Sequence, residues 1–240
     1  MNDPASTIDP PRTVSQAQRP AAVLWDFDGT LADTEPLWIK AEFALVESLG
    51  ATWSYEHAEY MVGNSLLDSG AYILQVIGRP DLEPAWVVDR LIEQVVAELD
   101  EQPIPWRPGA LELLQTLNDA RIPCALVSAS YRVILDAVLR RLPYGRFTES
   151  VAGDEVSLGK PDPEPYLLAA ERLGVRARDC VVIEDSANGA ASGNASGALV
   201  LAVETYVHVP RVTRRVHRDT LVGLGVDDLA GLLGQANATA

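Results

Sequence analysis

Two acidic residues, Asp26 and Asp28, lie two positions apart directly after an apolar run and are followed by Gly29 and Thr30. If the chain turns at Asp28, both carboxylates face one pocket. One can then attack a phosphorus atom as a nucleophile, while the other exchanges a proton with the leaving oxygen. The alternative is a structural Asx turn with glycine in the left-handed conformation. The apolar run before the acids and the threonine after them favour the catalytic interpretation.

Two further polar residues have the chemistry of a phosphate site. Ser128 closes a second apolar run and is followed by Ala129, so a hydroxyl and free backbone N–H groups can bind a phosphoryl group there. The alternative for Ser128 is an ordinary helix N-cap. Lys160 lies between Gly159 and Pro161, in a loop that two prolines stiffen. A lysine held in this way can reach both a phosphoryl oxygen and a carboxylate, although most loop lysines are only solvated.

Adjacent acids, Glu184 and Asp185, follow a third apolar run. Carboxylate oxygens are the ligands that Mg²⁺ prefers, which makes this pair a candidate metal site. Alternatively, the two charges only complement the dipole of a helix that begins after them. Asp26, Ser128 and Asp185 all fall at the ends of runs that read as strands, and this repetition favours a common site.

The elements that position these residues alternate between apolar runs and helical patterns. The apolar runs lack the alternation of a half-buried strand and are typical of a parallel sheet that is buried on both faces. They are 22–25, 124–127, 180–183 and 199–203. Helical patterns at 131–141, 163–173 and 187–196 separate or follow them. This order predicts an α/β fold with a doubly wound parallel sheet and right-handed crossovers.

The stretch between the first and second strands reads as helices only. A stripe of apolar residues ends at Gly50, and further helices are predicted at 66–77 and 84–100, the last with Pro84 in its first turn. We therefore expect an α/β core of residues 21–33 and 106–240, with an all-helical cap of residues 34–105 inserted in it. Residues 1–20, rich in Pro, Ser, Thr, Gln and Ala, are expected to be a disordered tail.

Charge and composition exclude several classes of function. The net charge of −15 argues against a nucleic-acid surface, which needs a basic face. A phosphate site must then create positive potential locally, with a metal, a lysine and backbone N–H groups. Cys124 and Cys180 lie in apolar runs and are expected to be buried thiols in a reducing compartment, the cytoplasm by default. No apolar stretch approaches the ~20 residues that span a bilayer.

Taken in order, these motifs resemble those of the haloacid dehalogenase-like (HAD) hydrolase superfamily. The motifs are Asp26-Phe27-Asp28-Gly29-Thr30, Ser128, Lys160 and Glu184-Asp185, and the likeness runs from about Val23 to Val203. The stretches 147–163 and 184–189 resemble the branch that contains β-phosphoglucomutase and small sugar-phosphate phosphatases, whose helical cap follows the first motif. The resemblance implies a Rossmann-like core with a helical cap.

The resemblance also implies a role for each residue. Asp26 would be the nucleophile and a Mg²⁺ ligand, and Asp28 the general acid and base, with its carbonyl also on the metal. Asp185 would ligate Mg²⁺, with Glu184 as a ligand or as a partner of the ligands. The expected phosphate- and substrate-binding residues are Thr30, Ser128, Ala129, Lys160 and Glu35. Glu35 can equally be a charge in the first turn of a helix.

The same resemblance narrows the reaction. An acid at Asp28 indicates phosphate-ester chemistry, because the leaving alkoxide needs a proton. Mutases of this branch carry a cap histidine and a cap arginine where this sequence has Trp38 and Leu66, which favours hydrolysis. The sequence therefore predicts a Mg²⁺-dependent phosphatase for a small, sugar-type phosphate, working as a monomer or weak homo-oligomer. The alternatives are a phosphomutase that uses other cap residues and a non-catalytic protein that binds a phosphorylated metabolite.

Overall fold

A parallel β-sheet lies at the centre of the molecule. The computed structural model describes residues 19–205 and 207–238. Its strands are β1 (Val23–Trp25), β2 (Cys124–Val127), β3 (Glu149–Val151), β4 (Val181–Glu184), β5 (Leu199–Ala202) and β6 (Arg215–His217). They pair in the order β3-β2-β1-β4-β5-β6, with every pair parallel. The chain runs outward from β1 to β3 in one direction and from β4 to β6 in the other, so the strand order reverses between β1 and β4. Such a reversal opens a crevice beyond the carboxyl ends of these two strands.

Helices cover both faces of this sheet. Val23 and Trp25 of β1 pack into one apolar cluster, which also holds side chains of α5 (Ala110–Asp119), α6 (Arg132–Leu139) and α9 (Val226–Ala238). Leu24 points to the opposite face and packs with α7 (Glu164–Arg172) and α8 (Ala187–Ala195). Both faces of the central strands are therefore buried, which is why their sequences are continuously apolar.

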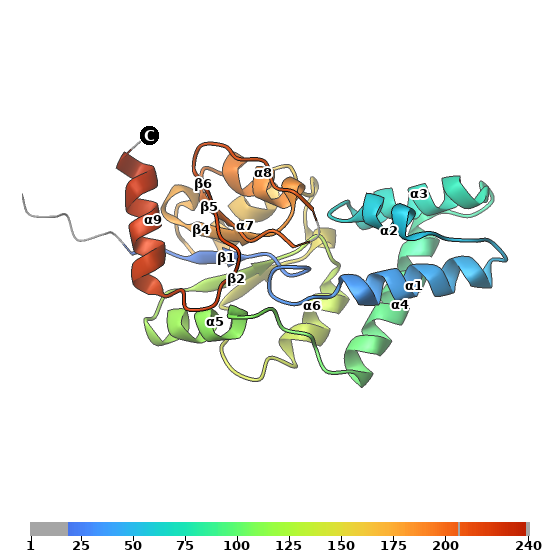
Figure 1. Cartoon of the computed structure of the whole chain (residues 1–240), viewed down its shortest axis with the longest axis horizontal. Helices are drawn as coiled ribbons and strands as arrows, with labels where there is room; N and C mark the ends of the chain where they lie inside the picture. The colour runs from blue at the N-terminus through green and yellow to red at the C-terminus, as the bar shows by residue number, and fades with distance from the viewer. Residues whose placement is uncertain (1–18, 206, 239–240) are drawn as a thin grey trace, which may run out of the picture.

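The remaining helices lie between β1 and β2 in sequence. They are α1 (Glu35–Ser48), α2 (Tyr55–Met61), α3 (Leu66–Ile77) and α4 (Pro84–Glu101). Ser54 and Ser65 cap α2 and α3 with their hydroxyls, and Gly78 ends α3 in the left-handed conformation. Figure 1 shows α1–α4 grouped together, to one side of the part formed by the sheet and the helices that cover it.

The predicted fold class, an α/β doubly wound parallel sheet with inserted helices, is confirmed. The four predicted strands correspond to β1, β2, β4 and β5, whereas β3 and β6 were not predicted. Helices α2, α5 and α9 were also missed. The predicted tail of residues 1–20 falls, except for Arg19 and Pro20, outside the described residues. No helix in the described ranges is long and apolar enough to cross a membrane.

Candidate active site

The predicted site residues converge where β1, β2 and β4 end. Trp25 at the end of β1 is in register with Leu126 of β2 and with Ile183 of β4. The residues that follow these positions therefore meet at one edge of the sheet. The backbone N–H of Asp26 donates to the carbonyl of Ile183 at 3.0 Å, which fixes the nucleophile candidate against the strand that carries the other acids.

Lys160 is held between two carboxylates. Its Nζ lies 2.6 Å from Oδ1 of Asp26 and 2.7 Å from Oε1 of Glu184, and it also donates to the carbonyl of Val127. The ring of Tyr166 lies 5.0 Å from the ammonium. Burial lowers the pKa of Lys160, but the charges of Asp26 and Glu184 raise it by more than burial lowers it. The pKa of Lys160 therefore lies well above its ordinary value. The lysine is therefore a fixed positive charge in the crevice.

Both carboxylate oxygens of Glu184 accept hydrogen bonds from neighbouring protein groups. It is fully buried, and Oε1 accepts from Lys160 and from the hydroxyl of Tyr166. Oε2 accepts from the backbone N–H groups of Asp185 and Ser186 and from the Ser186 hydroxyl. Both oxygens are thus already satisfied by protein groups. This favours Glu184 as the residue that positions Lys160, and disfavours it as a metal ligand.

Asp26 and Asp185 have the properties of cation ligands. Oδ2 of Asp26 is buried without a hydrogen-bond partner, and carboxylate oxygens of Asp26, Glu184 and Asp185 lie within 4.8 Å of one another. Burial raises the pKa of Asp26 to about 7, Glu184 adds to the rise, and Lys160 only partly offsets it. Burial and the charge of Asp26 likewise raise the pKa of Asp185. Clustered carboxylates of this kind are costly without a cation, and oxygen donors are those that Mg²⁺ takes.

Glycine at position 29 makes the cluster possible. Gly29 has a φ of +85°, and a Cβ there would collide with the carboxylate of Asp185. The turn after β1 therefore needs both the left-handed conformation and the missing side chain. Thr30, which is buried, reaches towards the same carboxylate, with Oγ1 3.5 Å from Oδ1 of Asp185. The structure thus places Thr30 behind the acids and outside the pocket lining.

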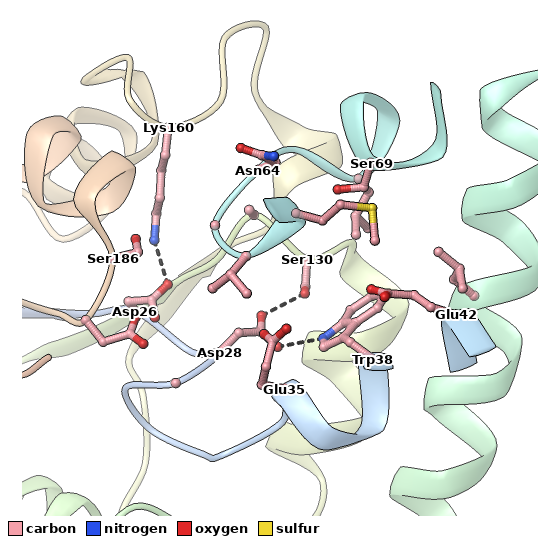
Figure 2. A pocket seen from close by; sticks show the side chains of 18 residues that line it. Asp26, Asp28, Glu35, Trp38, Glu42, Asn64, Ser69, Ser130, Lys160 and Ser186 are labelled. Carbon is pink, nitrogen blue, oxygen red and sulfur yellow. Dashed lines mark hydrogen bonds and ion pairs between the residues drawn. The ribbon is translucent and has the colours of Figure 1, made fainter. Parts of the chain in front are cut away.

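Asp28 is surrounded by donors. Its Oδ1 accepts from the Thr34 hydroxyl at 2.6 Å and from Nε1 of Trp38 at 3.0 Å. Its Oδ2 accepts from the hydroxyls of Ser128 at 3.1 Å and of Ser130 at 2.8 Å. Figure 2 shows the bonds from Trp38 and Ser130. The Ser128 hydroxyl is thus engaged with Asp28, and it is Ala129 and Ser130 that line the pocket.

A pocket of about 90 Å³ separates these residues from α1–α4. The loops at the sheet edge contribute Asp26, Asp28 and Lys160 to its lining, and α1 contributes Glu35, Trp38 and Glu42. The loop from α2 to α3 adds residues 62–64, and Leu66 lies at the start of α3. The predicted substrate residue Glu35 therefore lines the same pocket as Asp26 and Asp28.

Several residues that the structure brings to the site were not predicted from the sequence. They are Thr34, Ser130, Glu42 and Tyr166, together with the bond from Trp38 to Asp28. Ser130 could have been found, because it follows Ser128 by two positions in a strand-end loop. Glu42 carries a weaker signal: it lies about two helical turns after Glu35 and so shares its face of α1. Tyr166 carries none.

Comparisons with known proteins agree with this geometry. A family model described as haloacid dehalogenase-like hydrolase matches residues 20–197. The chain is 30% identical to hexitol phosphatase A of Escherichia coli (strain K12) over 206 residues, covering 79% of this chain and 85% of that protein. It is 32% identical to a phosphorylated carbohydrates phosphatase of Thermotoga maritima over 184 residues, covering 73% and 81% respectively. The crystal structure of CbbY from Rhodobacter sphaeroides in complex with phosphate is similar with a TM-score of 0.80 and 27% identity, covering 88% of this chain and 99% of that one.

Proposed function

Because the chain belongs to the haloacid dehalogenase-like hydrolase family, we propose that it is a magnesium-dependent phosphatase for a small, sugar-type phosphate monoester. The observation that supports this function most directly is the hydrogen bonding of the two carboxylate oxygens of Asp26. One of its oxygens is paired with Lys160, and the other is buried without a partner at the edge of the sheet. A carboxylate in this state is ready to bind a cation and to attack an electrophile.

The first step forms an acyl phosphate on Asp26. A carboxylate oxygen of Asp26 attacks the phosphorus atom, the bond from phosphorus to the ester oxygen breaks, and Asp28 gives a proton to the departing alkoxide. The Lys160 ammonium, with backbone N–H groups after β2, offsets the negative charge that spreads over the phosphoryl oxygens. Lys160 also orients Asp26 and favours its ionised form, because the two are joined by a bond of 2.6 Å.

The second step returns the enzyme to its starting state. Asp28, now a carboxylate, takes a proton from a water molecule whose oxygen attacks the phosphorus atom. The bond between phosphorus and Asp26 breaks, and inorganic phosphate leaves. Thr34, Trp38 and the two serines hold Asp28 in place for the proton transfers.

Asp26, Asp185 and the backbone carbonyl of Asp28 are the groups that would hold Mg²⁺. The orphaned oxygen of Asp26 and the raised pKa values of both carboxyls fit a divalent cation at this place. When bound, the cation supplies positive charge beside the phosphoryl oxygens. Glu184 supports the site through Lys160, since its own oxygens are engaged.

The helices of residues 34–105 serve as a cap over a core of residues 21–33 and 106–240. The pocket is small beside the roughly 300–1,000 Å³ of pockets that enclose a drug-sized ligand. We therefore expect the cap to open for substrate entry and to close for chemistry, which keeps water from the first step and admits it to the second. The names of the relatives, a hexitol phosphatase and a phosphorylated carbohydrates phosphatase, support a sugar-type leaving group.

The lining of the pocket favours hydrolysis over a mutase reaction. Within the described residues, Lys160 is its one cationic side chain. Leu66, which stands in the sequence where the related mutases carry an arginine, also lines the pocket and offers no charge to a second phosphate.

Both cysteines are buried free thiols, which fits a reducing compartment such as the cytoplasm.

A panel of metabolite phosphates, assayed with and without Mg²⁺, tests the function. We expect phosphate release from hexitol or hexose phosphates, lost on chelation of the metal. An isomerised sugar phosphate that accumulates without free phosphate would indicate a phosphomutase instead. Substrates that bind but release no phosphate across the panel would indicate a non-catalytic binding protein.

A further inference from the structure

A second pair of carboxylates lies in the pocket away from the Lys160 end. Glu35 and Glu42 are both on α1 and both line the cavity. They belong to the cap side, and neither is among the acids that surround Lys160 and the candidate metal site. Asp26 lines the same pocket, so the two carboxylates share one cavity with any leaving group whose phosphoryl group is at Asp26.

Glu42 is the more deeply buried of the two, with 5% of its surface exposed. Its Oε2 accepts a hydrogen bond from Nε1 of Trp53 at 3.1 Å. Its Oε1 has no hydrogen-bond partner, and no ion pair joins Glu42 or Glu35 to a cation within the described part of the chain. In Figure 2 the Glu42 side chain extends from its helix towards Trp38, into the pocket.

Holding Trp53 in place does not by itself explain this carboxylate. A glutamine would accept the same hydrogen bond without the cost of burying a charge. Burial raises the pKa of Glu42 to about 7, and the bond from Trp53 offsets this only in part. Burial, followed by the charges of Glu42 and Asp28, raises the pKa of Glu35 to about 8. Lys160 cannot compensate, because it is already paired with two other carboxylates.

We propose that Glu42 is a specificity-determining residue which, together with Glu35, selects phosphate monoesters whose leaving group presents hydrogen-bond donors and carries no second anion. This inference rests on the function proposed above. The unpartnered Oε1 accepts a bond from the distal end of the leaving group. The lining around the two carboxyl groups offers no cation to a distal phosphate or carboxylate, and the carboxyl groups repel such an anion when they are ionised. The donor is either a hydroxyl of a polyol or an ammonium group, which offer the carboxylates the same kind of contact.

Equilibrium binding tests the selection without relying on turnover. Calorimetry with the Asp26→Asn protein in Mg²⁺ compares glucitol 6-phosphate, glucosamine 6-phosphate and glucose 1,6-bisphosphate. Each is measured with Glu42 intact, with Glu42→Gln, and with Glu47→Gln as the control. Glu47 lies on the same helix, but it is exposed and lies outside the pocket. Glu42→Gln keeps the shape and the acceptor for Trp53, and its thermal unfolding shows whether it folds.

With Glu42 intact, we expect the bisphosphate to bind more weakly than either monophosphate. The discrimination is the ratio of the dissociation constant of the bisphosphate to that of a monophosphate. In Glu42→Gln this ratio should shrink on the order of tenfold, and in the control it should not change. Glu42→Asp, which keeps the charge, should keep most of the discrimination. A larger loss for the amino sugar than for the polyol assigns the donor to an ammonium group, and equal losses assign it to hydroxyls.

Three results would overturn the assignment of Glu42. They are an unchanged discrimination in Glu42→Gln, equal changes in Glu42→Gln and Glu47→Gln, and no binding of either monophosphate with Glu42 intact. Failure of the phosphatase function is seen separately, as ligands that bind the parent protein but release no phosphate from it.

Discussion

At the scale of single residues, the surroundings of Asp28 suit the proton transfers that the proposed function assigns to it. The indole N–H of Trp38 can only donate, whereas the hydroxyls of Thr34, Ser128 and Ser130 can rotate and either donate or accept. Trp38 therefore holds Oδ1 as an acceptor, whereas the hydroxyls of Ser128 and Ser130 can turn from donating to accepting when Oδ2 carries a proton. This makes Trp38 a positioning residue for Asp28.

Replacing Trp38 with phenylalanine should lower kcat roughly tenfold, because a hydrogen bond to a charged group is lost. KM should change less than kcat, since the phosphoryl site is intact. Steady-state kinetics on a sugar phosphate measure both constants. Trp86→Phe, an exposed tryptophan on α4, is the matched control and should leave both unchanged. A kcat for Trp38→Phe equal to that of the parent would contradict the role.

The buried carboxylate of Glu42 has a consequence for stability. Its pKa rises from 4.5 in the unfolded chain to about 7 in the fold, so its contribution favours folding below pH 4.5 and is lost as the pH rises through 7. Glu42→Gln removes this loss. The free energy of unfolding of the variant, relative to the parent, should therefore be higher at pH 8 than at pH 5 by on the order of 2 kcal/mol.

Chemical denaturation of Glu42→Gln and of the parent at both pH values measures the difference. The exposed Glu47→Gln should show no such trend with pH. If the difference in unfolding free energy between Glu42→Gln and the parent were the same at pH 5 and pH 8, the carboxylate would not be buried as the structure shows.

At the scale of elements, a hydrogen bond joins α8 to a loop between two of the inserted helices. The side chain of Asn188 donates to the carbonyl of Gly63 at 3.0 Å, and Gly63 lies in the loop from α2 to α3. This loop also lines the pocket. In the proposed arrangement of cap and core the bond lies where the two meet, and its loss should favour an open cap.

Asn188→Ala should increase the opening of this loop roughly threefold to tenfold, since a typical hydrogen bond contributes about 0.5–1.5 kcal/mol. Hydrogen exchange at the amides of residues 62–66 measures the opening. Asn194→Ala serves as the control, because Asn194 is also on α8 but bonds to carbonyls of Thr213 and Arg214. Equal exchange rates in the parent and Asn188→Ala would show that the contact does not restrain the cap.

The sequence predicted the elements whose environment leaves a continuous signature. Strands β1, β2, β4 and β5 are fully buried and therefore continuously apolar. The unpredicted β3 and β6 are three residues long and mostly half-exposed, so their composition does not distinguish them from loops. Strand-end residues of the site could be predicted because parallel strands end at one edge. Glu42 and the contact of Trp38 could not, because they depend on how α1 is rotated above that edge.

At the scale of the whole molecule, the chain has a net charge of −15, and the proposed cation site gathers buried carboxylates within this acidic protein. Mg²⁺ should stabilise the fold, since it offsets the repulsion of Asp26 and Asp185, and a ligand at 100 times its dissociation constant adds about 2.7 kcal/mol. Thermal unfolding with Mg²⁺, and with NaCl at the same ionic strength, separates binding from screening. Asp185→Asn should lose the specific shift in unfolding temperature. Asp100→Asn, which changes an exposed acid on α4, should keep it. An equal shift in all three proteins would exclude this site.

The most direct test of the account is phosphate release by the parent and by Asp26→Asn. Both are assayed in Mg²⁺ with the sugar phosphate that the parent hydrolyses fastest, and Asp100→Asn controls for the loss of one negative charge. The parent and the control should release phosphate at the same rate. Asp26→Asn should be slower on the order of 10³-fold or more, because an amide cannot form the phosphorylated intermediate. Release by Asp26→Asn at the rate of the parent would contradict Asp26 as the nucleophile.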